Sequence, residues 1–153
     1  MIDKVLIASR SDADAIAKLV NTAYRPAPDL AGWTHETGLV AGDRITTGQV
    51  EAIMATPDSF ILAGVSNSEM VACVHIEREG NHSYIGMLSV KPLVQGSGIG
   101  KQMLAHAESH ASNVFGSEKF TMIVVSARSE LIAFYLRRGY ERTGVIMDFP
   151  LSA

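Results

Sequence analysis

Three glycines fall close together in the segment Gln95-Gly96-Ser97-Gly98-Ile99-Gly100. An apolar run, Tyr84 to Val90, precedes this segment, and a helical pattern that extends to about Val114 follows it. Glycines let a backbone approach a ligand closely, because no Cβ stands in the way. The first N–H groups of a helix have no intrahelical partner, and the helix dipole favours negative charge there. The sequence therefore predicts a site for a phosphorylated ligand at this junction of strand, turn and helix.

The spacing of the glycines excludes two familiar phosphate loops. The dinucleotide fingerprint G-x-G-x-x-G needs a third glycine where this chain has Lys101. The P-loop needs glycine at Gln95 and a hydroxyl residue at Gln102, and both are missing. What remains is the pattern Q-x-x-G-x-G, formed by Gln95, Gly98 and Gly100. The alternative is a glycine-rich turn that only connects a strand to a helix, although such a turn does not require three glycines.

Composition limits the class of protein. The 153 residues suit one domain, 1–153, with 47% hydrophobic and 19% charged residues. The net charge of −3, without a run of Lys or Arg, disfavours binding to nucleic acid. No apolar run approaches the about 20 residues of a membrane span, and no signal peptide is recognisable at the N-terminus. Cys73, the only cysteine, excludes an intrachain disulfide and fits a buried bystander. We expect a cytoplasmic protein.

The elements that must hold the glycine segment follow the order βααβββαβαββ. Ser11 with Asp14 resembles a capping box for the first helix, and Thr46 or Thr47 caps the second. Short turns between the next three strands predict antiparallel neighbours. The expected strands are Lys4–Ala8, Ser59–Val65, Met70–Glu77, Tyr84–Val90, Phe120–Val125 and two short ones between Tyr140 and Pro150. The helix after the glycines has an apolar face formed by Ile99, Met103, Ala107, Ala111 and Val114.

Two motifs in this order resemble the GNAT superfamily of acyl-CoA-dependent N-acyltransferases. The first is Leu88 to Lys101, a strand ending in V-x-P followed by Q-x-x-G-x-G. The second is Ala133 to Tyr140, which matches a helix ending in Y-x-x-x-G-[FY]. The resemblance covers nearly the whole chain. It implies an α/β fold, with a mixed central sheet of about six to seven strands flanked by four helices.

The resemblance implies acetyl-CoA as the cosubstrate and no metal. Backbone N–H groups around the glycines would hold the pyrophosphate, a role that suits a nest of N–H groups at a helix start. The pantetheine arm would pair with the strand that ends at Val90, which needs that strand and Phe120–Val125 to splay apart. A backbone N–H near Leu88 or Ser89 would polarise the thioester carbonyl. The implied cofactor-binding residues are Leu88, Ser89, Val90, Gln95, Gly96, Ser97, Gly98, Ile99, Gly100, Lys101, Ser129 and Phe134.

Tyr135 corresponds to the tyrosine that many members of the family use as a general acid. A tyrosine, with an ordinary pKa of about 10, can donate a proton to the departing CoA thiolate at neutral pH. The alternative is a core tyrosine on an apolar helix face. Some members carry a glutamate base on the strand before the glycines, and here that position is Tyr84. A base acting through water, or an amine that arrives deprotonated, fits this sequence better than a direct carboxylate.

The acceptor side is expected between the first two helices. There Trp33, His35 and Glu36 combine aromatic and polar groups, and with Tyr84 they are the candidate substrate residues. Trp33 as a cap on the core, with two solvated neighbours, is an equal alternative. The pair His106 and His110 at helical spacing fits a solvated helix face better than a metal site.

Two functions remain open at this point. The first is an N-acetyltransferase that moves an acetyl group to a primary amine, on a small molecule or a protein. The second is a non-catalytic module that binds or senses acyl-CoA. A homodimer is an expectation from the family alone.

Overall fold

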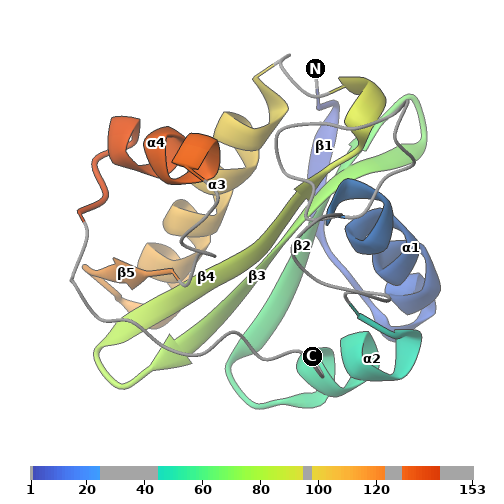
Figure 1. Ribbon diagram of the computed structural model, residues 1–153. Helices are drawn as coiled ribbons and strands as arrows, with labels where there is room; N and C mark the ends of the chain where they lie inside the picture. Colours follow the sequence, from blue (N-terminus) through green and yellow to red (C-terminus); the bar gives the residue numbers. More distant parts are fainter. Residues whose placement is uncertain (1, 25–44, 95–97, 123–128, 142–153) are drawn as a thin grey trace.

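The computed structural model describes residues 2–24, 45–94, 98–122 and 129–141. They form one mixed sheet with helices on both faces (Figure 1). The elements are β1 (Lys4–Ile7), α1 (Ala13–Tyr24), α2 (Thr47–Ala55), β2 (Ser59–Ser66), β3 (Glu69–Glu79), β4 (His82–Val90), α3 (Ile99–His110), β5 (Phe120–Thr121) and α4 (Ser129–Arg137).

The α/β class and the four helices agree with the sequence. The expected six to seven strands and the full element order are not confirmed, because five strands are described. The two strands expected between Tyr140 and Pro150 fall mainly outside the described residues. Within the described part of the chain, no helix is both long and apolar enough to cross a membrane.

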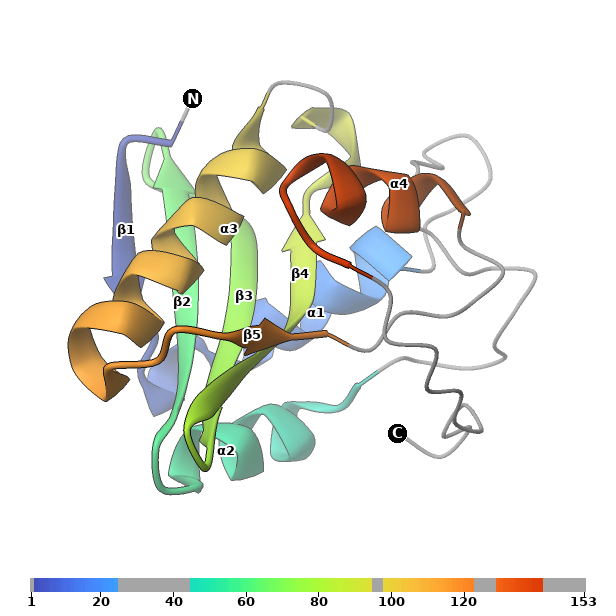
Figure 2. The same cartoon turned by 90° about the vertical axis from the view of Figure 1, so that its left-hand side faces the viewer.

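The strands are ordered β1-β2-β3-β4-β5 in the sheet, and Figure 2 shows β1 to β4 side by side. The first four are antiparallel neighbours, and β5 runs parallel to β4 after the crossover through α3. The β2–β3 hairpin turns at Asn67 and Ser68, which both have positive φ, as a tight hairpin turn of matching twist requires. The predicted antiparallel hairpins are therefore confirmed.

Local capping sets where the first two helices begin. The Thr46 Oγ1 accepts a hydrogen bond from the Gln49 N–H (3.1 Å), and the Gln49 side chain accepts one from the Thr46 N–H (2.8 Å). This capping box confirms the predicted start of α2. The box expected at Ser11 and Asp14 is wrong by two residues: the Ser9 N–H donates to the Asp12 carboxylate, 2.9 Å, because a single 3₁₀ turn precedes α1.

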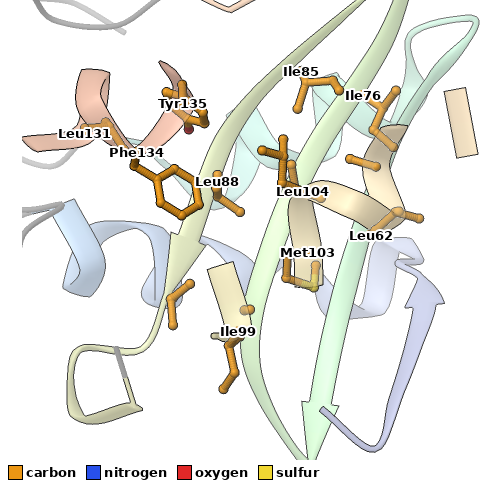
Figure 3. Close-up of a cluster of buried hydrophobic side chains, with 14 of the residues drawn as sticks. Leu62, Ile76, Ile85, Leu88, Ile99, Met103, Leu104, Leu131, Phe134 and Tyr135 are labelled. Carbon is orange, nitrogen blue, oxygen red and sulfur yellow. The ribbon is translucent and has the colours of Figure 1, made fainter. Parts of the chain in front are cut away.

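Two apolar cores lie on opposite faces of the sheet. One core joins the sheet to α3 and α4, and Figure 3 shows its labelled side chains converging between these helices and the strands. The other joins the sheet to α1 and α2. Buried members of the first core include Leu62, Val74, Ile76, Ile85, Leu88, Val90, Ile99, Met103, Leu104, Leu131, Phe134 and Tyr135. Those of the second include Ile16, Val20, Val50, Ile61 and Cys73.

The apolar face predicted for α3 holds for four of its five residues, while Val114 is 52% exposed. The chain passes into a π-helical turn, Ala111–Phe115, directly after α3. A π turn contains more residues than an α turn, so side chains beyond it rotate off the buried stripe. Phe115 packs against the core in place of Val114.

A buried hydrogen bond between two serine hydroxyls connects the start of β4 to the chain segment that leads into β5. Ser83 and Ser117 are almost fully buried, and their Oγ atoms lie 2.7 Å apart. The Ser83 N–H also donates to the Lys119 carbonyl, 3.0 Å. The described parallel pairing of β4 with β5 covers the next two rungs, Ser83 with Phe120 and Tyr84 with Thr121.

Met103 is fully buried in the first core, so its truncation provides a test of that core. We expect Met103→Ala to lower the free energy of unfolding by about 2–5 kcal/mol, because the lost contacts and the cavity both cost stability. The matched control is His106→Ala on the exposed face of α3, which should change stability by less than about 0.5 kcal/mol. Urea denaturation followed by circular dichroism measures both values, and equal losses would contradict this packing.

Cys73 gives a second test. Its side chain is fully buried, and burial raises the pKa of the thiol to about 12, with a hydrogen bond to Ser89 acting in the opposite direction. The reactive thiolate is therefore almost absent at neutral pH. We expect no reaction with a thiol reagent in the native protein at pH 8, and one thiol per chain after denaturation. Rapid labelling of the native protein would show that this face of the sheet opens.

Candidate functional site

The start of α3 leaves an open, positively polarised helix end. Gly98 is the N-cap, with φ 85° and ψ 3°, a conformation that favours glycine. A Cβ added there would meet no atom within 4 Å, so the surrounding space is open. The first helical bond runs from the Gln102 N–H to the Gly98 carbonyl, 3.1 Å. The preceding N–H groups, those of Ile99, Gly100 and Lys101, therefore have no acceptor within the helix and suit an anion.

Three elements meet directly behind this helix start. A Cβ added at Gly100 would lie 3.8 Å from Val90 Cγ2 and 3.8 Å from Phe134 Cζ. The end of β4, the first turn of α3 and the middle of α4 therefore face one another around Gly100, and Val90, Ile99 and Phe134 belong to one buried core. Arg138 places its guanidinium over the Phe134 ring, 5.1 Å from the centroid, which adds a positive charge to this corner.

A β-bulge interrupts β4 just before its end. Ser89 pairs with Cys73 and Gly86 pairs with His75, so two residues, Met87 and Leu88, fall opposite the single residue between those partners on β3. Met87 has φ 54°, an uncommon backbone conformation for a residue with a long side chain. Strained backbone of this kind costs about 1–3 kcal/mol and clusters at functional sites.

The bulge decides which core each side chain of β4 enters. Alternation from Ile85 would otherwise place Leu88 and Val90 on the α1/α2 face. One extra residue inverts the alternation, and Leu88 and Val90 join Ile85 in the core beneath α3 and α4. Ser89 turns to the opposite face, where it is fully buried and donates a hydrogen bond to the Met87 carbonyl, 3.0 Å.

Tyr135 lies in the same core as Leu88 and is 8% exposed (Figure 3). Its ring meets those of Phe134 and Tyr140 edge to face, with centroids 5.3 and 5.9 Å away. The Tyr140 hydroxyl donates to the Glu108 carboxylate, 2.7 Å, and this bond ties the end of α4 to α3. Burial, reinforced by that carboxylate, raises the pKa of Tyr140 well above its ordinary value. The Tyr140 hydroxyl therefore stays protonated and fixed.

A polar cluster occupies the α1/α2 face of the sheet next to the bulge. The Tyr84 ring lies over Gly86, so closely that a Cβ on Gly86 would overlap it. The ring also stands edge-on to His75, with 5.7 Å between centroids. The His75 Nε2 is 2.8 Å from Ser59 Oγ and 3.4 Å from Glu77 Oε1. Burial lowers the pKa of His75, while the Glu77 carboxylate acts in the opposite direction.

The structure brings together most of the predicted cofactor residues and Tyr135. Lys101 is exposed on the first turn of α3, and Ser129 is the first residue of α4. The glycine-loop residues Gln95, Gly96 and Ser97 lie outside the described residues, and so do the substrate candidates Trp33, His35 and Glu36.

The strand expected over Met70–Glu77 contains His75, but the sequence did not connect His75 to Ser59 and Tyr84. The available signal was the alternation of β3, which puts His75 and Glu77 on one face. Among the described residues no three His, Cys, Asp or Glu side chains are arranged to hold a metal ion.

Comparison with solved structures finds many similar folds. A tetramutant of the BH1408 protein from Bacillus halodurans is 17% identical, covers 97% of this chain and 99% of its own, and has a TM-score of 0.76. The PaiA N-acetyltransferase from Thermoplasma acidophilum, in complex with coenzyme A, is 17% identical with 90% of each chain covered and a TM-score of 0.74. The aminoglycoside antibiotic 6'-N-acetyltransferase AAC(6')-Ig from Acinetobacter haemolyticus is 14% identical, with 96% and 97% covered and a TM-score of 0.70.

A sequence search of curated proteins finds no match. The similarity to solved structures establishes the fold, since the identities are low. The decisive finding is the family model of the acetyltransferase (GNAT) domain, which matches residues 37–149, well over half of the chain. The chain belongs to the GNAT acetyltransferase family.

Proposed function

We propose that this protein is an N-acetyltransferase that moves the acetyl group of acetyl-CoA to a primary amine. One observation carries the proposal: a bulged strand end, an open helix start and a buried tyrosine contribute to one core, with Val90 and Phe134 next to Gly100. GNAT acetyltransferases use acetyl-CoA, and the PaiA structure contains coenzyme A. The acceptor is assigned only as an amine, on a small molecule or a protein.

The cosubstrate fits the described residues at both ends. Backbone N–H groups at Gly98, Gly100 and Lys101 are assigned to the pyrophosphate, because they lie before the first intrahelical hydrogen bond of α3, which Gln102 donates. Phe134 and Val90 form the apolar support behind that end. The backbone of Leu88, Ser89 and Val90 is assigned to the pantetheine arm. The splaying of β4 and β5 that this needs stays a prediction, since residues 123–128 lie outside the described part.

The reaction follows from the chemistry of a thioester. The amine nitrogen bonds to the carbonyl carbon, the carbon–sulfur bond breaks, and the thiolate takes a proton. We assign the polarisation of the carbonyl oxygen to a backbone N–H at Leu88 or Ser89, next to the bulge. Tyr135 is assigned as the general acid for the thiolate, because it lies in the same core as Leu88. A water-excluding core strengthens both interactions.

Several expectations stay predictions at this stage. They are the acceptor contacts of Trp33, His35 and Glu36, a homodimer and a cytoplasmic location.

The positive φ of Gly98 provides a test of the cofactor site. Alanine is strained there by about 1–2 kcal/mol, and the strain is relieved by moving the helix start. We expect Gly98→Ala to weaken acetyl-CoA binding about tenfold in isothermal titration calorimetry, a loss of about 1.4 kcal/mol.

The matched control for this test is Gly116→Ala. Gly116 has φ 69°, has nothing within 4 Å of an added Cβ, and ends the π-helical turn at the far end of α3. It should lose similar stability and keep full affinity for acetyl-CoA. Equal affinities in the two variants would place the cofactor elsewhere.

The second test addresses Tyr135. We expect Tyr135→Phe to lower kcat by about 10²–10⁴-fold on a panel of amines while the Kd for acetyl-CoA stays unchanged, because the ring is kept and the proton donor is lost. Release of free CoA thiol measures the rate. Tyr140→Phe is the matched control: its hydroxyl is bound to Glu108, so it should lose stability but keep most of its turnover.

These measurements also separate enzyme from binding module. Tight acetyl-CoA binding by the wild-type protein, without transfer to any amine on the panel, would favour the non-catalytic module. Turnover that does not depend on Tyr135 would keep the enzyme and remove the assigned acid.

A further inference from the structure

The polar cluster Ser59–His75–Glu77–Tyr84 lies where an amine acceptor needs a base. Helices α3 and α4 cover one face of the sheet and carry the proposed cofactor contacts and Tyr135. The cluster lies on the opposite face, at the row of β3 and β4 directly before the bulge, where His75 pairs with Gly86. An acceptor that approaches this part of β4 from the face not covered by α3 and α4 therefore meets the polar cluster.

An amine nucleophile must lose a proton before it attacks. Primary alkyl amines have pKa values of about 10, so they are ammonium ions at neutral pH and have no lone pair to donate. Tyr135 is assigned to the leaving thiolate on the other face, and it supplies a proton rather than accepting one. The proposed reaction therefore needs a second group, a base, on the acceptor side.

The geometry of the cluster suits that task. The Tyr84 ring folds along β4 so that its hydroxyl covers Gly86, next to the bulge. The His75 imidazole stands at the edge of that ring, 5.7 Å between centroids with 68° between planes. Behind it, Ser59 Oγ and Glu77 Oε1 both face the His75 Nε2, at 2.8 and 3.4 Å. A carboxylate beside Nε2 orients the ring and stabilises an imidazolium, as in other His–carboxylate pairs.

We propose that His75, oriented by Ser59 and Glu77, removes the proton of the acceptor's ammonium group through the Tyr84 hydroxyl. This inference rests on the proposed N-acetyltransferase function and names the missing acceptor-side base.

The proton transfers balance without any further reactant. One N–H bond of the ammonium breaks, its proton passes to the Tyr84 oxygen, and the Tyr84 proton passes to His75. The neutral amine then forms the carbon–nitrogen bond, the thiolate leaves with the proton of Tyr135, and the new amide nitrogen returns a proton to Tyr135. The imidazolium releases its proton to water past Glu77, whose side chain is 33% exposed.

The surroundings of His75 keep it neutral and basic in the resting protein. The titratable groups that face it are Glu77 and the fully buried Cys73 on its own strand, and Tyr84 on β4. Among the described residues, α1 and α2 contribute apolar side chains to this face. Burial is the larger effect and lowers the pKa of His75 below its ordinary 6.5, so the proton-accepting form is present at pH 7. Activity should fall as the pH drops through that lowered pKa.

The test compares two classes of acceptor in single variants. His75→Gln keeps a polar side chain without a titrating group, and Tyr84→Phe keeps the ring without the hydroxyl. With an alkyl amine at pH 7, each variant should lower kcat about 100-fold. With a hydrazide, which is neutral at that pH, both should lose less than about fivefold, because no proton has to be removed before attack. Acetyl-CoA affinity should not change.

The pH profile separates proton transfer from structure. In the wild-type protein, kcat/KM with the alkyl amine should show an acid limb set by His75. In His75→Gln this limb should disappear, and the rate should instead rise toward the pKa of the amine. Glu77→Gln should lower the pKa of His75 measured by NMR, because the carboxylate favours the charged ring. The matched control Glu79→Gln, on the same strand beside the half-buried His82, should leave both readouts unchanged.

Every outcome decides between the alternatives. Equal losses for alkyl amine and hydrazide, or an unchanged pH profile in His75→Gln, would overturn the relay while the acetyltransferase stands. If His75→Gln does not fold, Tyr84→Phe and Glu77→Gln carry the same comparison, and full activity in both would also overturn it. A wild-type protein that binds acetyl-CoA but acetylates neither acceptor class would instead refute the proposed function, and the relay with it.

Discussion

The extra residue in β4 is the constraint on which the candidate site depends. Without it, Leu88 and Val90 would face α1 and α2, and the core beneath α3 would lose two of its apolar members. Ile99, at the start of α3, could then not share a core with Val90. The unfavourable φ of Met87 is the local cost of this arrangement, and burial of two aliphatic side chains, about 1.5–3 kcal/mol each, offsets it.

The same irregularity divides the sheet into two chemical faces. On one side, the strand end meets a helix start, an arginine over a phenylalanine and a tyrosine held among aromatic rings. On the other side, a serine, a histidine, a glutamate and a tyrosine gather at the level of the bulge. In the proposed reaction, the acid and the base therefore lie on opposite faces of the sheet. Neither group of side chains has to be rearranged for the other to act.

Features that depend on neighbours in sequence could be predicted, and features that depend on pairing could not. Thr46 and Gln49 are three residues apart, and the hairpin turns and the positive φ of Gly139 follow from local residue type. The bulge could not be predicted from the sequence, because the segment of β4 is one continuous apolar run. Its register is set by pairing with β3, a separate strand. The histidine cluster was missed for the same reason: Ser59 and Glu77 are neighbours only through the register of β2 and β3.

Errors within single elements also have physical causes. Ser11 and Ser9 offer equivalent hydroxyls, and a 3₁₀ turn, which costs little, moved the cap to the earlier one. The π turn after α3 has no sequence signature in its five residues, so the exposure of Val114 could only be seen in three dimensions. The glycine motif could be recognised in the sequence because its proposed role depends on backbone N–H groups, and glycine is the residue type that lets a backbone approach a ligand closely.

The buried Ser83–Ser117 pair has a mechanical consequence for β4 and β5. Two hydroxyls and a backbone hydrogen bond pin the strands together at the end where β5 begins. In the proposed cofactor site, separation of β4 from β5 would be a rotation about this pivot rather than a slide along the pair. The displacement of β4 would then grow with distance from Ser83 and be largest at its end, Val90.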